Sequence, residues 1–158
     1  MTEEIFVPET QDKTARYRAL TNQLARLSKH ETNRIAVMAN AAAMLRQACG
    51  FFWVGFYLRD GDSELVLGPF QGPAACTRIG YGKGVCGTAW KDARSIVVPD
   101  VEKFPGHIAC SSLSRSEIVV PIFADGEFFA VLDIDSDAPA AFDEKDREGL
   151  EAFVKELK

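Results

Sequence analysis

A cysteine in a polar, turn-rich loop is the residue of this sequence best placed to do chemistry. Cys110 lies in PGHIACSSLSRSEIVVPIF (105–123), directly before an apolar stretch typical of a strand. A cysteine that packs as a small hydrophobe is expected inside such a strand, not in front of it. His107, three residues earlier, could act as a base for the thiol or be an exposed polar residue. The pattern predicts a working thiol at Cys110.

The other three cysteines have different surroundings. Cys76, in GPAACTRI, lies in a small-residue loop beside the start of a strand, which suits a mobile thiol. Cys86, in GKGVCGTAW, lies at or near a helix N-terminus, where backbone N–H groups and the helix dipole favour a thiolate. Cys49 follows an amphipathic helix and is expected to be a buried small hydrophobe. Cys76 and Cys86 are therefore the two candidate disulfide partners of Cys110.

A metal site is the rival explanation for these thiols. No pair of cysteines has the Cys-x₂₋₄-Cys spacing of a structural zinc site, and both histidines are isolated. We therefore expect neither a metal nor a bound cofactor, and thiol redox chemistry is the favoured interpretation.

The last predicted hairpin, with strands at 117–123 and 127–135, has a register that can be tested by the composition of its faces. A two-residue turn would place aspartates on the face that holds Ile118. A three-residue loop over 124–126 makes that face wholly apolar, with Ile118 opposite Leu132. We therefore predict the three-residue loop.

Three carboxylates then share the other face of this hairpin. In the predicted register Glu117 lies opposite Asp133, and Asp135 projects from the same face one pleat further along. Like charges directly opposite each other destabilise a sheet, so the cluster calls for an explanation. One interpretation is a solvated sheet end; the other is a pocket with an apolar floor and an acidic rim, suited to a small ammonium group. Crowding should raise the pKa of at least one of these carboxyls and leave a proton donor near neutral pH.

The elements that must position these groups follow from periodicity and turn signals. Helical spacing covers 12–48, with a polar interruption at 28–33 in which Thr32 could cap the second helix, and Gly50 closes it. Beyond the final hairpin, the sequence predicts strands at 51–60, 64–72 and 94–101, a short helix at 86–91 and a closing helix at 143–157. The order indicates an α+β domain with one central antiparallel sheet and helices packed on one face.

Composition bounds the remaining possibilities. A chain of 158 residues is expected to form one domain (1–158), with about 1–14 as an N-terminal extension. The net charge is −5 and there is no run of Lys and Arg, which argues against nucleic acid or an anionic membrane as partner. No stretch is apolar enough to span a bilayer, and the acidic N-terminus does not resemble a signal peptide. We therefore expect a cytoplasmic protein.

Three motifs in this order resemble those of a known family: GYGKGVCGTAW, HIACSSLSRSEIVVPI and AVLDIDSD. Together they are similar to the free methionine-R-sulfoxide reductases, which are built on a GAF domain, and the similarity covers the chain from about residue 15. The resemblance implies reduction of free methionine-R-sulfoxide, a homodimer, no bound cofactor, and thioredoxin as the external reductant.

The resemblance also implies roles for individual residues. Cys110 corresponds to the catalytic thiol that becomes a sulfenic acid, and Cys76 to the main resolving cysteine that forms a disulfide with it. Cys86 matches a further cysteine that pairs with Cys110 in some members. Substrate-binding positions are matched by the residues Glu117, Asp133, Asp135, Trp53 and Tyr57.

The chemistry of the residues is compatible with these roles. A sulfoxide becomes a good electrophile only when its oxygen is protonated, which a member of the carboxyl cluster can do. Trp53 could enclose the S-methyl group or belong to the core. The leading alternative function is a non-catalytic GAF sensor of a small ligand, and a redox sensor is the runner-up. The sequence leaves open which of Cys76 and Cys86 resolves the sulfenic acid and which carboxyl carries the proton.

Overall fold

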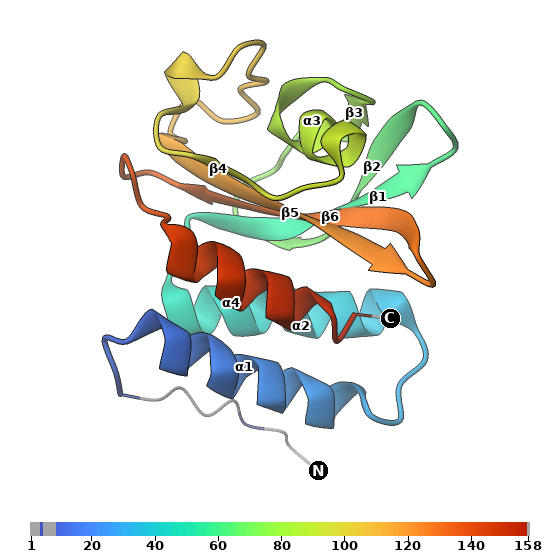
Figure 1. Cartoon of the computed structure of the whole chain (residues 1–158), viewed down its shortest axis with the longest axis vertical. Helices are drawn as coiled ribbons and strands as arrows, with labels where there is room; N and C mark the ends of the chain where they lie inside the picture. Colours follow the sequence, from blue (N-terminus) through green and yellow to red (C-terminus); the bar gives the residue numbers. More distant parts are fainter. Residues whose placement is uncertain (1–3, 5–8, 158) are drawn as a thin grey trace.

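The computed structural model describes Glu4 and residues 9–157. In the described residues, four α-helices and a six-stranded sheet form an α+β domain, as the sequence predicts. Figure 1 shows the sheet in the middle, with α1, α2 and α4 below it and α3 with the long loops above it. The part of the expected N-terminal extension that covers 1–3 and 5–8 lies outside the described residues.

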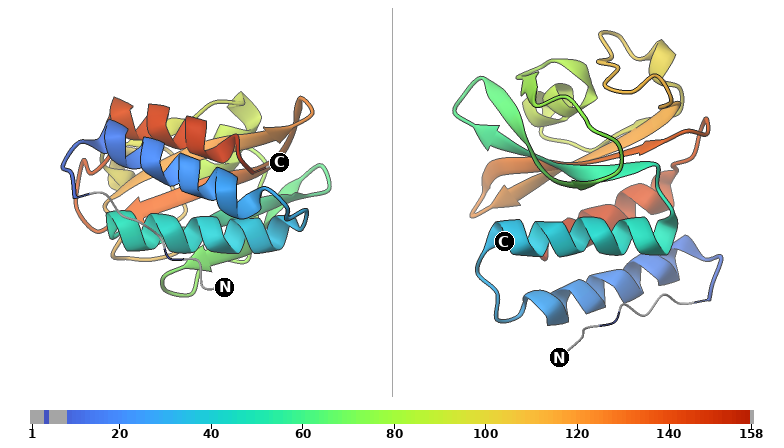
Figure 2. Two further views of the ribbon diagram at one scale, coloured as in Figure 1. Left: turned by 90° about the horizontal axis from the view of Figure 1, so that it is seen from below. Right: turned by 180° about the vertical axis from the view of Figure 1, so that it is seen from behind.

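Three helices form two layers on one side of the sheet. α2 (Arg34–Cys49) and α4 (Glu144–Val154) pack against the strands, and α1 (Lys13–Ser28) packs against both of them as an outer layer (Figures 1 and 2). Asn33 rather than the expected Thr32 caps α2, because its side-chain oxygen accepts hydrogen bonds from two backbone N–H groups of the first turn. Gly50 closes α2 in the left-handed conformation, as predicted.

All strands of the sheet pair antiparallel, in the order β3-β2-β1-β6-β5-β4. Their bounds are close to the predicted ones, and β3 is the short strand whose start was expected beside Cys76 but whose bounds were not predicted. The strands are β1 (Trp53–Asp60), β2 (Glu64–Gln71), β3 (Arg78–Gly80), β4 (Ile96–Val98), β5 (Ser116–Ala124) and β6 (Glu127–Ser136). The short helix α3 (Gly84–Asp92) follows β3 and packs over β5 and β6.

The register of the β5–β6 hairpin corrects the prediction. A two-residue turn at Asp125-Gly126, both with positive φ (53° and 78°), replaces the three-residue loop. An irregularity between Ile122 and Phe123 then leaves Phe129 as an extra residue on β6, so Ile118 lies opposite Ile134 rather than Leu132. The pairs are shifted by two residues from the predicted ones, and the predicted division into an apolar and an acidic face is therefore retained.

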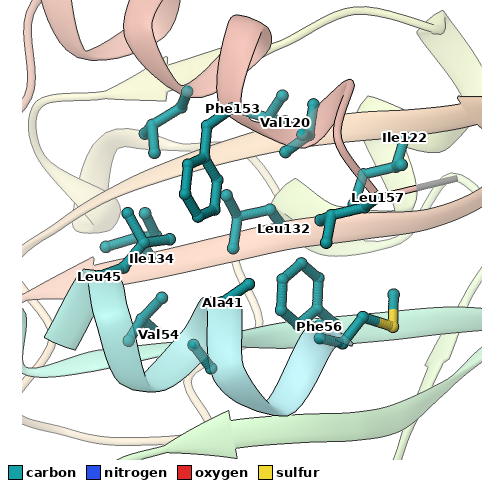
Figure 3. Packing of buried hydrophobic residues seen from close by; sticks show 14 of the residues in the cluster. Ala41, Leu45, Val54, Phe56, Val120, Ile122, Leu132, Ile134, Phe153 and Leu157 are labelled. Atoms are coloured by element: carbon teal, nitrogen blue, oxygen red, sulfur yellow. The ribbon is translucent and has the colours of Figure 1, made fainter. Parts of the chain in front are cut away.

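The main hydrophobic core lies between the sheet and the helices below it. Alternate residues of β1, β5 and β6 point toward α2 and α4, where their side chains interdigitate with those of the helices (Figure 3). The residues labelled in that view are Ala41, Leu45, Val54, Phe56, Val120, Ile122, Leu132, Ile134, Phe153 and Leu157. The intervening residues of the same strands point to the opposite face, where a second, smaller cluster packs under α3.

None of the helices in the described part of the chain is long and apolar enough to cross a membrane.

Candidate active site

The upper face of the sheet carries a cleft. Its floor comes from β1, β5 and β6, and its walls from α3 and from two loops around residues 73–76 and 107–114. Cys86 and Cys110 line this one cleft together with all five residues predicted to bind substrate: Trp53, Tyr57, Glu117, Asp133 and Asp135. Cys76 follows Ala75, which also lines the cleft, and is bonded to Cys110. The fold therefore gathers at one place the residues that the sequence analysis selected from separate segments.

Two of the thiols are joined in a disulfide. Cys76 and Cys110 are bonded to each other, with their Cα atoms 5.5 Å apart, although 34 residues separate them in the chain. Both are partly exposed and lie on opposing loops at the mouth of the cleft. Cys49 and Cys86 are free thiols, and Cys49 packs against the main core on the far side of the sheet. Thiol–disulfide exchange can therefore take place at the cleft.

The loop that carries Cys76 is tied to the sheet by two aromatic residues of β1. Trp53 Nε1 donates a hydrogen bond of 3.0 Å to the Pro73 carbonyl, and the Tyr57 hydroxyl donates one of 2.9 Å to the carbonyl of Cys76. The Trp53 ring also stacks on Phe70, with centroids 5.3 Å apart. These aromatic residues thus line the cleft and position the loop of Cys76 as well, a second task that the sequence did not reveal.

A glycine between them allows the close packing. Gly55 lies between Trp53 and Tyr57 on the same strand face, opposite Asp133 of β6. A Cβ atom at Gly55 would lie 2.3 Å from Cβ of Phe70 and 2.7 Å from the Trp53 ring. The absence of a side chain at Gly55 therefore lets β1 and β2 approach behind the aromatic wall of the cleft.

The acidic residues come together on the floor of the cleft. Glu117 lies opposite Asp135 in the sheet, not opposite Asp133 as predicted, and Asp133 pairs with Val119. Glu117 and Asp133 are buried, with 5% and 6% of their surface exposed, and Asp135 is partly exposed at the rim. Burial of charged groups is costly without partners, so this cluster is not a solvated sheet end.

The environment of these carboxyls shifts their pKa values. Burial raises the pKa of each of the three carboxyls well above its ordinary value, and the negative charge of a neighbouring carboxyl raises the pKa further. For Glu117 that neighbour is Asp135, and for Asp133 it is Glu117. The raised pKa values favour a protonated carboxyl in the cluster, which is what the predicted proton donor requires.

Cys86 differs from its prediction in one respect. It is in the first turn of α3, close to the helix N-terminus as expected, but its side chain is buried over Asp133 and Glu117. Burial, together with the charges of those carboxyls, raises the pKa of the Cys86 thiol well above its usual value. The helix dipole is thus outweighed, and the expected thiolate is replaced by a neutral thiol.

His107 also faces the acidic cluster. Its side chain is 13% exposed, and Nε2 lies 3.6 Å from Oε2 of Glu117. Burial lowers the pKa of His107. The imidazole therefore joins the loop of Cys110 to the floor of the cleft; neither of the two roles considered from the sequence described this contact.

The comparisons with known proteins agree with this geometry. The family model of the GAF domain matches residues 33–157. GAF domain-containing protein A of Dictyostelium discoideum is 55% identical over 145 residues, covering 92% of each chain. The free methionine-R-sulfoxide reductase of Escherichia coli is 43% identical over 147 residues, covering 92% of this chain and 88% of the other.

The structure of this chain is also similar to a solved structure. The X-ray structure of free methionine-R-sulfoxide reductase from Neisseria meningitidis in complex with its substrate superposes with a TM-score of 0.93. It is 52% identical, with 98% of this chain and 93% of that chain covered. The fold and the cleft define a GAF domain that carries a disulfide-bonded pair of cysteines above an acidic floor. The chain belongs to the GAF family and, within it, to the group of the free methionine-R-sulfoxide reductases.

Proposed function

We propose that this protein reduces free methionine-R-sulfoxide to methionine, with Cys110 as the attacking thiol. The observation that carries the proposal is the bonded pair of Cys76 and Cys110 at the mouth of a cleft whose floor holds buried carboxylic acids. Relatives with that activity are similar over nearly the whole chain, which supports the same substrate.

In the first step, the reduced Cys110 attacks the sulfoxide sulfur. A protonated carboxyl of the cluster formed by Glu117, Asp133 and Asp135 gives its proton to the sulfoxide oxygen, which makes the sulfur electrophilic. The sulfur–oxygen bond breaks, and methionine leaves with its sulfur reduced by two electrons. The oxygen passes to the Cys110 sulfur as the transient bond between the two sulfurs breaks, and the thiol proton returns to the carboxylate. Cys110 is then a sulfenic acid, so the cysteine sulfur is oxidised by two electrons.

In the second step, the Cys76 thiol attacks the sulfenic acid. A sulfur–sulfur bond forms, the oxygen leaves as water, and the chain reaches the disulfide state that the structure has. Cys86 is buried on the floor and bonded to neither partner, which favours Cys76 as the resolving residue. Two thiols and one sulfoxide thus give one disulfide, methionine and water.

The residues that line the cleft suit the functional groups of a free amino acid. An ionised carboxylate among the three acids can hold the ammonium group, while another member carries the proton. The ring of Trp53 offers an apolar wall for the S-methyl group, and backbone N–H groups of the Cys110 loop are the proposed donors for the substrate carboxylate. A cleft that encloses both charged ends of an amino acid would exclude methionine sulfoxide within a peptide.

Further parts of the proposal concern the cellular setting. Thioredoxin is the proposed external reductant, since thiol exchange with the partly exposed disulfide would restore both cysteines. We also propose a cytoplasmic homodimer that works without a bound cofactor. The resemblance of the motifs supports the dimer, and the free thiols at Cys49 and Cys86 suit a reducing compartment.

Substitution of the cysteines tests the proposal, with consumption of each methionine sulfoxide isomer, free and acetylated, as the measurement. Cys110→Ser should abolish reduction of the free R isomer. Cys76→Ser should still release about one methionine per chain in a single turnover but lose recycling by thioredoxin. Cys49→Ser, on the far side of the sheet, is the matched control and should keep both activities. Near-normal turnover by Cys110→Ser would contradict the proposal and favour a ligand sensor.

A further inference from the structure

We infer that Cys86, Glu117 and Asp133 form a binding site for a thiophilic divalent cation such as Zn²⁺ on the floor of the cleft. The three side chains come from α3, β5 and β6. One ligand atom from each, a sulfur and two carboxylate oxygens, lies within 4.8 Å of the others, and all three residues are buried. Cys86 lies outside the Cys76–Cys110 disulfide and is a free thiol that can act as a ligand.

An unsatisfied acceptor points independently to a cationic ligand. Asp133 is only 6% exposed, and its Oδ1 atom is buried without a hydrogen-bond partner in the described residues. Among the ion pairs of the described residues, His107 is the one basic partner of this cluster, through Glu117. A buried carboxylate oxygen without a donor is costly, and a bound cation would satisfy it.

The donor set selects the kind of cation. Zn²⁺ binds thiolate sulfur, imidazole nitrogen and carboxylate oxygen in a tetrahedron, whereas Ca²⁺ and Mg²⁺ need six or more ligands, all of them oxygen. The three protein ligands leave the fourth position of the tetrahedron to water, as in zinc sites with three protein ligands. Corners of a zinc tetrahedron are about 3.5 Å apart, so small side-chain rotations must draw the ligand atoms together. The Cys86 thiol and any protonated carboxyl lose their protons to solvent, and no group is oxidised or reduced.

A cation at this position would compete with the substrate. Glu117 and Asp133 are two of the residues proposed to hold the ammonium group and protonate the sulfoxide, so Zn²⁺ and methionine sulfoxide would exclude each other. This competition rests on the proposed function, whereas metal binding itself does not. The cleft would therefore be occupied either by a zinc-like ion or by an amino acid.

The disulfide provides a clean way to test the site. In the oxidised protein without added reductant, Cys76 and Cys110 are bonded and cannot act as metal ligands, so the thiols left are Cys86 and Cys49. Calorimetric titration with Zn²⁺ should then show one ion per chain, and titration with Mg²⁺ should show none. Co²⁺ in place of Zn²⁺ should give a sulfur-to-metal charge-transfer band, which reports a thiolate ligand directly.

Variants locate the ion. Cys86→Ala and Asp133→Asn should each weaken Zn²⁺ binding at least as much as the roughly 10–100-fold that loss of an outer-shell partner costs. Cys49→Ala is the matched control and should bind as the parent protein does. Thermal unfolding without metal checks that each variant is folded. If a variant does not fold, the charge-transfer band of the parent protein still decides whether a thiolate binds the metal.

Several results would overturn the inference: no Zn²⁺ binding by the oxidised protein, equal binding of Mg²⁺, binding that survives Cys86→Ala, or binding lost in Cys49→Ala. The competition is tested in the double variant Cys76→Ser/Cys110→Ser, which lacks both redox thiols and cannot consume the ligand. Free methionine-R-sulfoxide should displace Zn²⁺ from it. If Zn²⁺ binds through Cys86 but methionine sulfoxide does not displace it, the metal site stands and the shared location is wrong.

Discussion

Glu117 of β5 lies directly opposite Asp135 of β6, and burial together with the charge of Asp135 raises the pKa of the Glu117 carboxyl. Asp135 also lies opposite Trp53 of β1, the strand on the other side of β6. The acidic pair therefore lies next to the aromatic wall of the cleft. Like charges opposite each other oppose folding, and a proton held between them relieves the repulsion. Such a pair lowers the stability of the fold, and it provides a protonated carboxyl that can act as a general acid.

The first prediction separates these two properties. Glu117→Gln removes one charge of the pair, so the free energy of unfolding should stay the same or rise. Reduction of methionine sulfoxide should fall by about 100-fold or more, as expected for loss of a general acid or its partner. Glu127→Gln, exposed at the other end of the same hairpin, is the matched control and should leave activity unchanged. A parallel loss of melting temperature and activity would show that Glu117 is a structural residue.

The second prediction concerns the pH dependence of stability. A carboxyl whose pKa is raised in the folded state stabilises the fold fully below its ordinary pKa and loses that contribution as the pH rises through the raised value. The free energy of unfolding of the parent protein should therefore fall, relative to that of Asp133→Asn, from acidic to neutral pH. Denaturant unfolding of both oxidised proteins at a series of pH values measures this difference.

The comparison with the variant is needed because His107 acts in the opposite direction. Its pKa is lowered by burial, so its contribution grows as the pH rises and would mask part of the effect in the parent protein alone. Both proteins contain His107, and the difference between them isolates the carboxyl. A difference that stays constant with pH would mean that folding does not raise the pKa of Asp133.

The sequence predicted the face of each strand better than the partner of each residue. The rule that one face must be apolar placed Glu117, Asp133 and Asp135 together on the other face, and the structure agrees. The three-residue loop predicted between β5 and β6 was wrong. A two-residue turn combined with an extra residue at Phe129 gives the same alternation of the two faces as the longer loop would. Alternation has a period of two, so it cannot distinguish registers that differ by two residues.

The loops around the cleft were the least predictable part of the site. Cys110 was selected as a reactive thiol from its polar loop and Cys76 from its small-residue loop, but their pairing came only from the resemblance to a family. Their contact depends on how the two loops are held, and for Cys76 the hydrogen bond from Tyr57 to its carbonyl shows part of this support. Such bonds involve backbone atoms, which leave no signal in the pattern of side chains.

The third prediction tests that support. Tyr57→Phe removes the hydroxyl that donates to the Cys76 carbonyl and leaves the carbonyl without this donor. The loss of such a bond costs about 1 kcal/mol, which is several-fold in an equilibrium constant. The Cys76–Cys110 disulfide should therefore be several-fold easier to reduce in a titration against dithiothreitol. Tyr81→Phe, in which the ring is 45% exposed and packs on Trp90, is the control and should leave the redox equilibrium unchanged.

The fourth prediction concerns the glycine behind the aromatic wall. Gly55→Ala would bring a methyl group within 2.3 Å of Cβ of Phe70 and 2.9 Å of its Cα, so the backbones of β1 and β2 must move apart. Overpacking of this kind costs about 1–3 kcal/mol, and the melting temperature should fall accordingly. Because Trp53 would be displaced as well, the KM for methionine sulfoxide should rise.

Gly80→Ala provides the comparison for that variant. The new methyl group at Gly80 would meet the flexible Lys83 side chain at 3.1 Å, and a small rotation of this side chain would accommodate it. Both glycines lie in strands, and neither needs a positive φ, so the two substitutions differ mainly in the rigidity of the neighbour that must give way. We expect a large loss of stability at Gly55 and a small one at Gly80. Equal losses would show that the intrinsic preference of alanine for other conformations, rather than contact with Phe70, determines the effect.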